Sequence, residues 1–356
     1  MRYKSLKGFW LVSLYLLLLL SIIGSGYGQH HRTDISVVAS LPCYASIAKY
    51  IGGDLVIVDH IAAGNQDPHF VQPKPSYARM LTRADLFITT GLDLELWVPT
   101  IIDKARNKKI FEGAVGYVSA ATDISLVDKP LVNPDRSMGD VHVYGNPHIH
   151  TSPLNAKLIA ENILIGLKKV SPENSAIYDD NYKEFVNQID RSMFGDELVD
   201  MFGGEVLSKM VMSGTLISFL QTKEYGGEKL ISKLGGWLSK GMPFRGKKVM
   251  CYHKNWNYFA RDFGLEIIDY IEPKPGIPPT AKHVKEVIEE IEKQDIRVMI
   301  VANYFERNSP KMIAERTGIK DVFIPLDVAG EPDVNTYFDL IDCWIDRLNE
   351  AFKLSG

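Results

Sequence analysis

Short apolar runs typical of buried strands alternate with segments of helical spacing in two separate parts of the chain. In the first part, strands are predicted at residues 35–39, 55–61 and 85–90, and helices at 42–51, 75–82 and 94–105. In the last part, strands are predicted at residues 247–252, 265–271, 296–302 and 322–327, and helices at 255–263, 280–293, 310–317 and 336–354. Such alternation indicates βαβ units, so each part predicts a mostly parallel sheet flanked by helices.

The segment between these two parts predicts how they are joined. Residues 151–192 keep helical spacing with one joint at Ser171-Pro172, because the residue before proline is pushed out of the helical region. We therefore predict an α/β fold of two lobes, residues 29–150 and 246–356, joined by a long helical connector, residues 151–192. Residues 193–245 fit neither lobe and are predicted to be an insertion whose role the sequence does not show. At 46% apolar residues, the chain can build two cores rather than one.

The first 28 residues have the order of a secretory signal peptide. Arg2, Lys4 and Lys7 precede an apolar run of residues 9–23, and small residues follow up to Gly28. The run is about 15 residues, short for a membrane span of ~20 residues, so cleavage near Gly28 is favoured over a retained signal anchor. Since no cysteine stands at that point, bacterial lipid anchoring is not predicted. We expect an exported, periplasmic protein.

Charge and cysteine content exclude some classes of partner and scaffold. Loss of the signal peptide would change the formal net charge from −4 to −7, which argues against nucleic acid as a partner. The three cysteines, Cys43, Cys251 and Cys343, are too few for a disulfide framework, and the sequence does not say whether any two of them pair.

Five of the nine histidines fall in predicted loops, where ligand-binding side chains are expected. His30 and His31 lie near the predicted mature N-terminus, His60 in a strand and His283 in an amphipathic helix, positions that favour structural or surface roles. The five loop histidines are His69, His142, His148, His150 and His253. In open α/β sheets, ligands bind outside the carboxyl ends of the strands. Of the five, His69, His148 and His253 fall at such ends or beside the junction of the lobes, which predicts a metal site between them.

A fourth ligand is expected from the loop after the last predicted strand. Asp327 stands there, although aspartates in such loops more often cap the backbone. Glu331, Asp333 and Asp339 are its competitors, the last of them within the closing helix.

Several short motifs occur in an order that resembles one family of binding proteins. They are Val37-Val-Ala-Ser-Leu-Pro42, Gly52-Gly-Asp54, Asp67-Pro-His69, Ala84-Asp-Leu-Phe87, Asn146-Pro-His148, Tyr258-Phe-Ala-Arg261 and Pro325-Leu-Asp327. The chain, apart from the insertion, resembles the cluster A-I, zinc- and manganese-type substrate-binding proteins of ABC importers. The resemblance implies two α/β lobes joined by a rigid helix, with the metal ligands His69, His148, His253 and Asp327.

The resemblance further implies a transport function rather than catalysis. We expect high-affinity capture of Zn²⁺ as the transported substrate, and its delivery to an ABC transporter membrane permease by a monomer that a periplasmic metallochaperone can load. Three imidazoles and one carboxylate suit tetrahedral Zn²⁺, and His253 stands where manganese members carry a carboxylate. The chain departs from many zinc members, whose histidine-rich loop is here reduced to His142, and it offers His150 as an alternative to His148.

Three other interpretations stay open from the sequence. A zinc hydrolase would need a coordination position left open for water, and no His-Glu-x-x-His segment or Gly-x-Ser-x-Gly motif is present. A manganese-binding member of the same family is the second. The third is an interaction module or metal chaperone built around residues 193–245.

Overall fold

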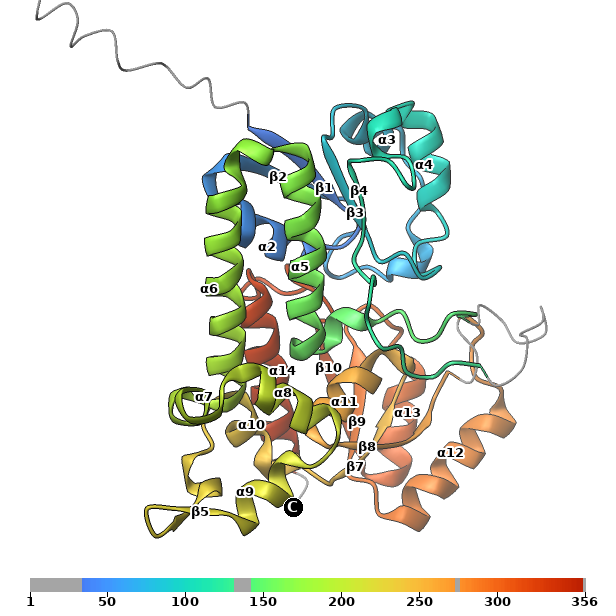
Figure 1. Cartoon of the computed structure of the whole chain (residues 1–356). Helices are drawn as coiled ribbons and strands as arrows, with labels where there is room; N and C mark the ends of the chain where they lie inside the picture. Colours follow the sequence, from blue (N-terminus) through green and yellow to red (C-terminus); the bar gives the residue numbers. More distant parts are fainter. Residues whose placement is uncertain (1–33, 131–141, 273–275, 355–356) are drawn as a thin grey trace, which may run out of the picture. The chain divides into compact units, whose positions relative to one another are not determined.

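Each half of the chain contains one four-stranded sheet of parallel strands (Figure 1). The computed structural model describes residues 34–130, 142–272 and 276–354, and both sheets belong to one unit that begins at Ile35. The predicted signal peptide, residues 1–28, lies outside the described residues. In the described part of the chain, no helix is long and apolar enough to cross a membrane.

The first sheet has the strand order β2-β1-β3-β4, and all its neighbours are parallel. Its strands are β1 (Ile35–Ala39), β2 (Val56–His60), β3 (Leu86–Thr89) and β4 (Tyr117–Ser119), and its helices are α2 (Pro42–Gly52), α3 (Pro75–Thr82) and α4 (Val98–Ala105). All four residues of β3 are buried, as expected for a parallel strand covered on both faces. Helix α2 begins with Pro42, whose fixed φ suits a first helical turn, and ends at Gly53 with φ 54°. The short strand β4 was not predicted from the sequence.

The second sheet repeats this arrangement with the order β10-β9-β7-β8, again with parallel neighbours. Its strands are β7 (Lys248–Cys251), β8 (Glu266–Tyr270), β9 (Val298–Ala302) and β10 (Lys320–Ile324), and its helices are α11 (Asn257–Phe263), α12 (Ala281–Gln294), α13 (Asn308–Thr317) and α14 (Tyr337–Leu354). The predicted fold class, two α/β lobes with mostly parallel sheets, is therefore confirmed.

The predicted connector, residues 151–192, contains two helices rather than one. Helix α5 (Pro153–Val170) packs against β3 and β4, and α6 (Ser175–Phe194) lies beside it and also contacts α2 and α8 (Figure 1). The chain reverses direction at Ser171 and the short 3-10 helix η6 (Pro172–Asn174). The joint predicted at Ser171-Pro172 is thus a turn. Helix α5 contacts β3 and β4 of the first half and α11 of the second, whereas α6 contacts α2 of the first half and α8 and α10 of the predicted insertion.

Between α6 and the second sheet lies a set of short elements within the predicted insertion, residues 193–245. They are α7 (Asp196–Phe202), α8 (Gly204–Met212), α9 (Leu216–Thr222), the antiparallel pair β5 (Glu224–Tyr225) and β6 (Glu228–Lys229), η7 (Leu230–Lys233), α10 (Gly236–Gly241) and η8 (Met242–Phe244). Helix α10 packs against α6 and α14, so this region is joined to the rest of the fold by helix packing.

One large core extends through both halves, which differs from the two separate cores expected from composition. Buried residues of the first sheet, α5, α6, α11, the inner face of the second sheet and α14 form a single cluster, while a smaller cluster lies under α12 and α13. The beginning of α14 joins the halves directly. The backbone N–H of Tyr337 donates to Ser46 Oγ in α2 (3.0 Å), and its hydroxyl donates to the carbonyl of His150 (2.8 Å). These bonds hold the beginning of α14 against α2 and against the segment that precedes α5.

Candidate metal centre

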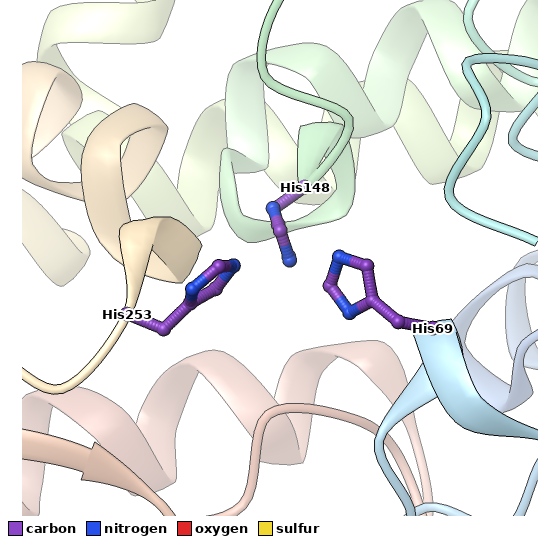
Figure 2. A group of neighbouring side chains, drawn as sticks. All are labelled: His69, His148 and His253. Carbon is purple, nitrogen blue, oxygen red and sulfur yellow. The ribbon is translucent and has the colours of Figure 1, made fainter. Parts of the chain in front are cut away.

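Three histidines from three different loops point toward one another (Figure 2). His69 lies in the 3-10 helix η2 (Pro68–Phe70), after β2; His148 immediately precedes η5 (Ile149–Thr151), before α5; His253 follows β7. One ring nitrogen from each lies within 4.8 Å of the others. All three side chains are buried: His148 and His253 are 0% and 2% exposed, and the side chain of His69 is 7% exposed. The three histidines that were predicted as ligands are thus brought together.

The side chain of His69 is oriented by the residue that begins its 3-10 helix. Asp67 Oδ1 accepts the backbone N–H of His69 (3.0 Å) and contacts Nδ1 of its ring (2.7 Å). Burial raises the pKa of Asp67, but the hydrogen bonds and charge of His69 outweigh burial, and the net pKa is lowered. Trp97 adds a hydrogen bond from its indole to the carbonyl of Pro68 (2.8 Å). The Asp67-Pro-His69 motif therefore holds the ring through its Nδ1 side.

The same arrangement recurs at His148. Asn146 Oδ1 accepts the backbone N–H of His148 (3.0 Å) and contacts its Nδ1 (2.9 Å). The Asn146 amide in turn donates to the carbonyl of Lys254 (2.7 Å), next to the third histidine, and to Asp128 Oδ2 (2.9 Å). One amide side chain therefore orients His148 and ties its loop to the loop of His253.

His253 is oriented by a carboxylate. Glu272 Oε2 lies 2.7 Å from His253 Nδ1, and the other oxygen, Oε1, accepts the backbone N–H of Gly276 (2.8 Å). Glu272 is itself buried, so its two oxygens are held in place on both sides. Each of the three rings thus has an oxygen acceptor beside its Nδ1.

An oxygen acceptor at Nδ1 favours the tautomer that carries the proton there and leaves Nε2 with a free lone pair. Within the described residues, the Nε2 atoms of His148 and His253 are buried without a hydrogen-bond partner, and Nδ1 of His253, although 2.7 Å from Glu272 Oε2, also lacks a well-aligned hydrogen bond. Ligating histidines usually have such an acceptor on the other ring nitrogen, which fixes the ring and raises its basicity. The three rings are therefore arranged as metal ligands, whereas buried polar groups in a core are normally hydrogen-bonded.

A fourth imidazole, His142, lies beside this cluster. Its Nε2 is 3.1 Å from Nε2 of His69, and the two rings stack at 5.2 Å between centroids. The sequence left the role of His142 open, because one histidine in a long polar loop carries no spacing signal. The short distance between His142 and His69 is set by the tertiary structure, because the two residues are 73 positions apart in the chain.

The surroundings keep these imidazoles neutral. Burial, followed by the neighbouring histidines, lowers the pKa of His148 well below its usual value, and burial lowers the pKa of His253. The same causes lower the pKa of His142 to about 3. Because a metal binds the neutral ring, the site does not need to lose protons from these three histidines before it binds a cation.

The structure places the other predicted ligand, Asp327, in a different group. Its carboxylate lies within 4.8 Å of ligand atoms of Cys43 and His150, and it accepts the backbone N–H of Cys43 (2.6 Å) and of Val328 (2.7 Å). The strand before it, β10, ends at Ile324, so Asp327 lies three residues beyond the strand. His150, which the sequence offered as an alternative to His148, belongs to this second group as well.

The remaining histidines have ordinary partners where they are described. His60 Nδ1 lies 2.8 Å from the carbonyl of Ala62, and His283 Nε2 lies 2.9 Å from the carbonyl of Tyr270. His30 and His31 lie outside the described residues. The thiols of Cys43, Cys251 and Cys343 are all free, and the first two are buried.

Comparison with known proteins identifies relatives of this arrangement. A family model described as zinc-uptake complex component A, periplasmic, matches residues 37–193 and 230–351. The zinc-binding lipoprotein AdcA of Streptococcus pneumoniae (strain TIGR4) is 22% identical over 90% of this chain and 56% of AdcA, so the chain spans just over half of that relative. The manganese ABC transporter substrate-binding lipoprotein scaA of Streptococcus gordonii is 26% identical, covering 94% of this chain and 96% of scaA.

Solved structures show the same fold. A zinc-bound deletion mutant of ZnuA superposes with a TM-score of 0.65 and 21% identity, covering 89% of this chain and 98% of ZnuA. The two parallel sheets and the buried histidine site define the class, the two-lobed α/β substrate-binding proteins. Within that class, the chain belongs to the family of zinc-uptake complex component A, periplasmic, whose model matches well over half of it. The resemblance seen in the sequence motifs is thereby confirmed.

Proposed function

We propose that this protein captures Zn²⁺ outside the cytoplasmic membrane and delivers it to the membrane permease of an ABC-type importer. The observation that carries the proposal is the set of three buried rings, each held at Nδ1 by an oxygen and each directing Nε2 to one centre. A tetrahedral zinc with bonds of ~2.0–2.1 Å separates its ligand nitrogens by about 3.3 Å. The three ring nitrogens, which lie within 4.8 Å of one another, are thus near the spacing that one zinc ion requires.

His142 is the proposed fourth ligand. Its Nε2 lies 3.1 Å from Nε2 of His69, near the ~3.3 Å expected for two ligands of one zinc ion. Asp327, the fourth ligand expected from the sequence, would first have to give up its bonds to the amides of Cys43 and Val328. The two candidates are therefore compared directly in the experiment below.

The ligand types favour zinc over manganese. Imidazole suits zinc, copper and nickel, whereas manganese prefers carboxylate, carbonyl and water oxygens. The named relatives include both a zinc-binding and a manganese-transporting lipoprotein, so the metal of this chain has to be argued from its own residues. With an imidazole at His253 and a second one at His142, this chain offers nitrogen where oxygen would be needed for manganese.

A role in transport agrees with a closed coordination shell. Structural and storage zinc sites use four protein ligands, whereas a catalytic zinc keeps one position for water or substrate. A fourth ligand at His142 therefore argues against the zinc hydrolase considered above. The predicted signal peptide supports export to the periplasm. The proposal extends to a monomer that a metallochaperone loads and that delivers the ion to the permease.

Metal content and affinity of matched variants test the proposal. We expect wild-type protein to bind one zinc tightly at the histidine site, and His69→Ala, His148→Ala and His253→Ala each to lose it while remaining folded. His283→Ala, a histidine outside the site, is the matched control and should bind like wild type. His142→Ala should weaken zinc binding more than Asp327→Ala does. Retention of wild-type affinity in any of the three ligand variants, or tighter binding of manganese than of zinc, would refute the proposal.

A further inference from the structure

A second group of metal-binding side chains lies buried next to the histidine site. Cys43, at the beginning of α2, His150, in η5, and Asp327, after β10, each place a ligand atom within 4.8 Å of the others. Their exposed fractions are 0%, 1% and 7%. The rings of His148 and His150 lie 6.5 Å apart, so the two groups are neighbours but share no residue.

His150 is anomalous for a buried histidine. Among the described residues, neither of its ring nitrogens makes a well-aligned hydrogen bond, although the backbone of Leu326 lies close enough to raise its pKa against the larger, lowering effect of burial. The edge of the ring faces Tyr44 at 6.3 Å between centroids, an apolar contact. A buried side chain with two unsatisfied nitrogens calls for a partner such as an ion.

Asp327 is anomalous for a buried carboxylate. It accepts two backbone N–H groups, yet in the described part of the chain no lysine or arginine forms an ion pair with it. Burial raises its pKa to about 7 despite those two bonds and a further hydrogen bond with the Cys43 thiol. A buried carboxylate is stabilised by a positive charge, and a bound cation at this point would supply one.

One thiol, one imidazole and one carboxylate are a donor set that suits zinc. Zn²⁺ is bound in proteins by cysteine sulfur, histidine nitrogen and aspartate oxygen, and a coordinating thiol is deprotonated outright. Binding would release the proton of Cys43, and the proton of Asp327 where that carboxyl is protonated, to solvent, and the thiolate and carboxylate together would balance the two positive charges of the ion. Because the ion and its two anionic ligands would carry no net charge together, a zinc ion in the histidine site would repel them little. Both sites could therefore be filled at the same time.

We propose that Cys43, His150 and Asp327 form a second Zn²⁺ site, separate from the histidine site and filled independently of it. The inference goes beyond the proposed transport function, since it requires two ions for each chain. The near-complete burial of all three ligands implies slow exchange of this ion, so it is held by the protein while the histidine site loads and unloads.

Titration with Co²⁺ distinguishes the two sites, because only the second contains sulfur. We expect wild-type protein to take up two Co²⁺ and to show a thiolate-to-cobalt charge-transfer band in the near ultraviolet. Cys43→Ser and His150→Gln should each lower uptake to one Co²⁺, and Cys43→Ser should abolish the band. Cys251→Ser, which changes a buried cysteine outside the group, is the matched control and should keep both ions and the band.

The same titration separates failure of this inference from failure of the proposed function. His69→Ala should lose the sulfur-free Co²⁺ and keep the charge-transfer band. A wild-type protein without the band, or a band that persists in Cys43→Ser, would overturn the second site and leave the histidine site unaffected. Loss of the band in both Cys43→Ser and His69→Ala would show that the sites are not independent and would overturn the proposal as stated.

Discussion

Replacement of Glu272 by glutamine tests whether the oxygen beside each Nδ1 contributes to metal binding. Glu272 Oε2 lies 2.7 Å from His253 Nδ1, and Oε1 is held by the backbone N–H of Gly276. Glutamine has nearly the same shape and can still accept the Nδ1 proton through its single oxygen, but its NH2 group then replaces the oxygen that accepts the backbone N–H of Gly276. The substitution therefore removes the negative charge behind His253 and the hydrogen bond from Gly276, and leaves the side-chain volume almost unchanged.

The expected loss follows from the kind of hydrogen bond that is changed. A hydrogen bond to a charged group contributes about 1.5–3 kcal/mol, against about 0.5–1.5 kcal/mol for a neutral pair. The difference, about 1.4 kcal/mol, corresponds to a tenfold weaker zinc affinity. This value lies at the lower end of the roughly 10–100-fold losses seen when partners of ligating histidines are replaced.

Competition with a chromophoric zinc chelator measures the affinity, and Glu286→Gln supplies the matched control. Glu286 Oε2 also approaches a histidine Nδ1, that of His283 at 3.8 Å, but its side chain is 54% exposed and lies outside the site. We expect the control to bind zinc like wild type. The nitrogen NMR signals of His253 should show a larger share of the Nε2–H tautomer in Glu272→Gln. Zinc affinity within twofold of wild type in Glu272→Gln, or an equal loss in Glu286→Gln, would refute the reasoning.

Three further predictions concern the stability of the fold. Burial lowers the pKa of His142 in the folded protein to about 3, below the unfolded value of ~6.5. Its titration therefore does not change the free energy of unfolding above pH 7, but it lowers that free energy as pH falls below 6.5, because the unfolded chain then binds a proton that the folded chain does not. Between pH 7.5 and 5, the free energy of unfolding of wild type, measured with denaturant, should therefore fall by about 2 kcal/mol more than that of His142→Gln. Equal losses in the two proteins would contradict this prediction. Ser152→Ala removes the N-cap of α5 and the hydroxyl that donates to buried Asp262, so unfolding free energy should fall by about 2–3 kcal/mol. In Gly64→Ala, the new Cβ would lie 2.0 Å from the carbonyl oxygen of Val328, so we expect a loss of about 1–3 kcal/mol and weaker zinc binding; an unchanged melting temperature would contradict this.

Most of the fold could be predicted from local sequence patterns. Strands β1 and β9 and helices α2, α3 and α12 lie within two residues of their predicted bounds, because buried strands and amphipathic helices have strong periodic signals. Strand β4 was missed since three residues are too few to show a period. The helical hairpin of α5 and α6 was predicted as one connector because spacing along the chain does not show where a helix reverses direction.

Three of the four predicted ligands lie together in the structure, and the fourth, Asp327, lies in a different group for a physical reason. The sequence selected His69, His148 and His253 because their loops follow the carboxyl ends of strands or lie beside the junction of the lobes. It placed Asp327 at the end of the last strand, but β10 stops at Ile324, and the three extra residues carry the carboxylate to the amide of Cys43. His142 could not be assigned, because nothing in its own segment fixes its distance from His69.

By itself, then, the sequence determined the two α/β halves, the loops that hold histidines and the motifs that place the chain in its family. These are properties of residues close together along the chain, where periodicity and side-chain type act directly. Tertiary structure alone decided that Asn146 ties the loop of His148 to that of His253, that Glu272 lies beside His253, that His142 meets His69, and that Cys43, His150 and Asp327 form a separate group. Each of these contacts joins segments far apart in sequence, and their distances are set by the packing of both halves into one core.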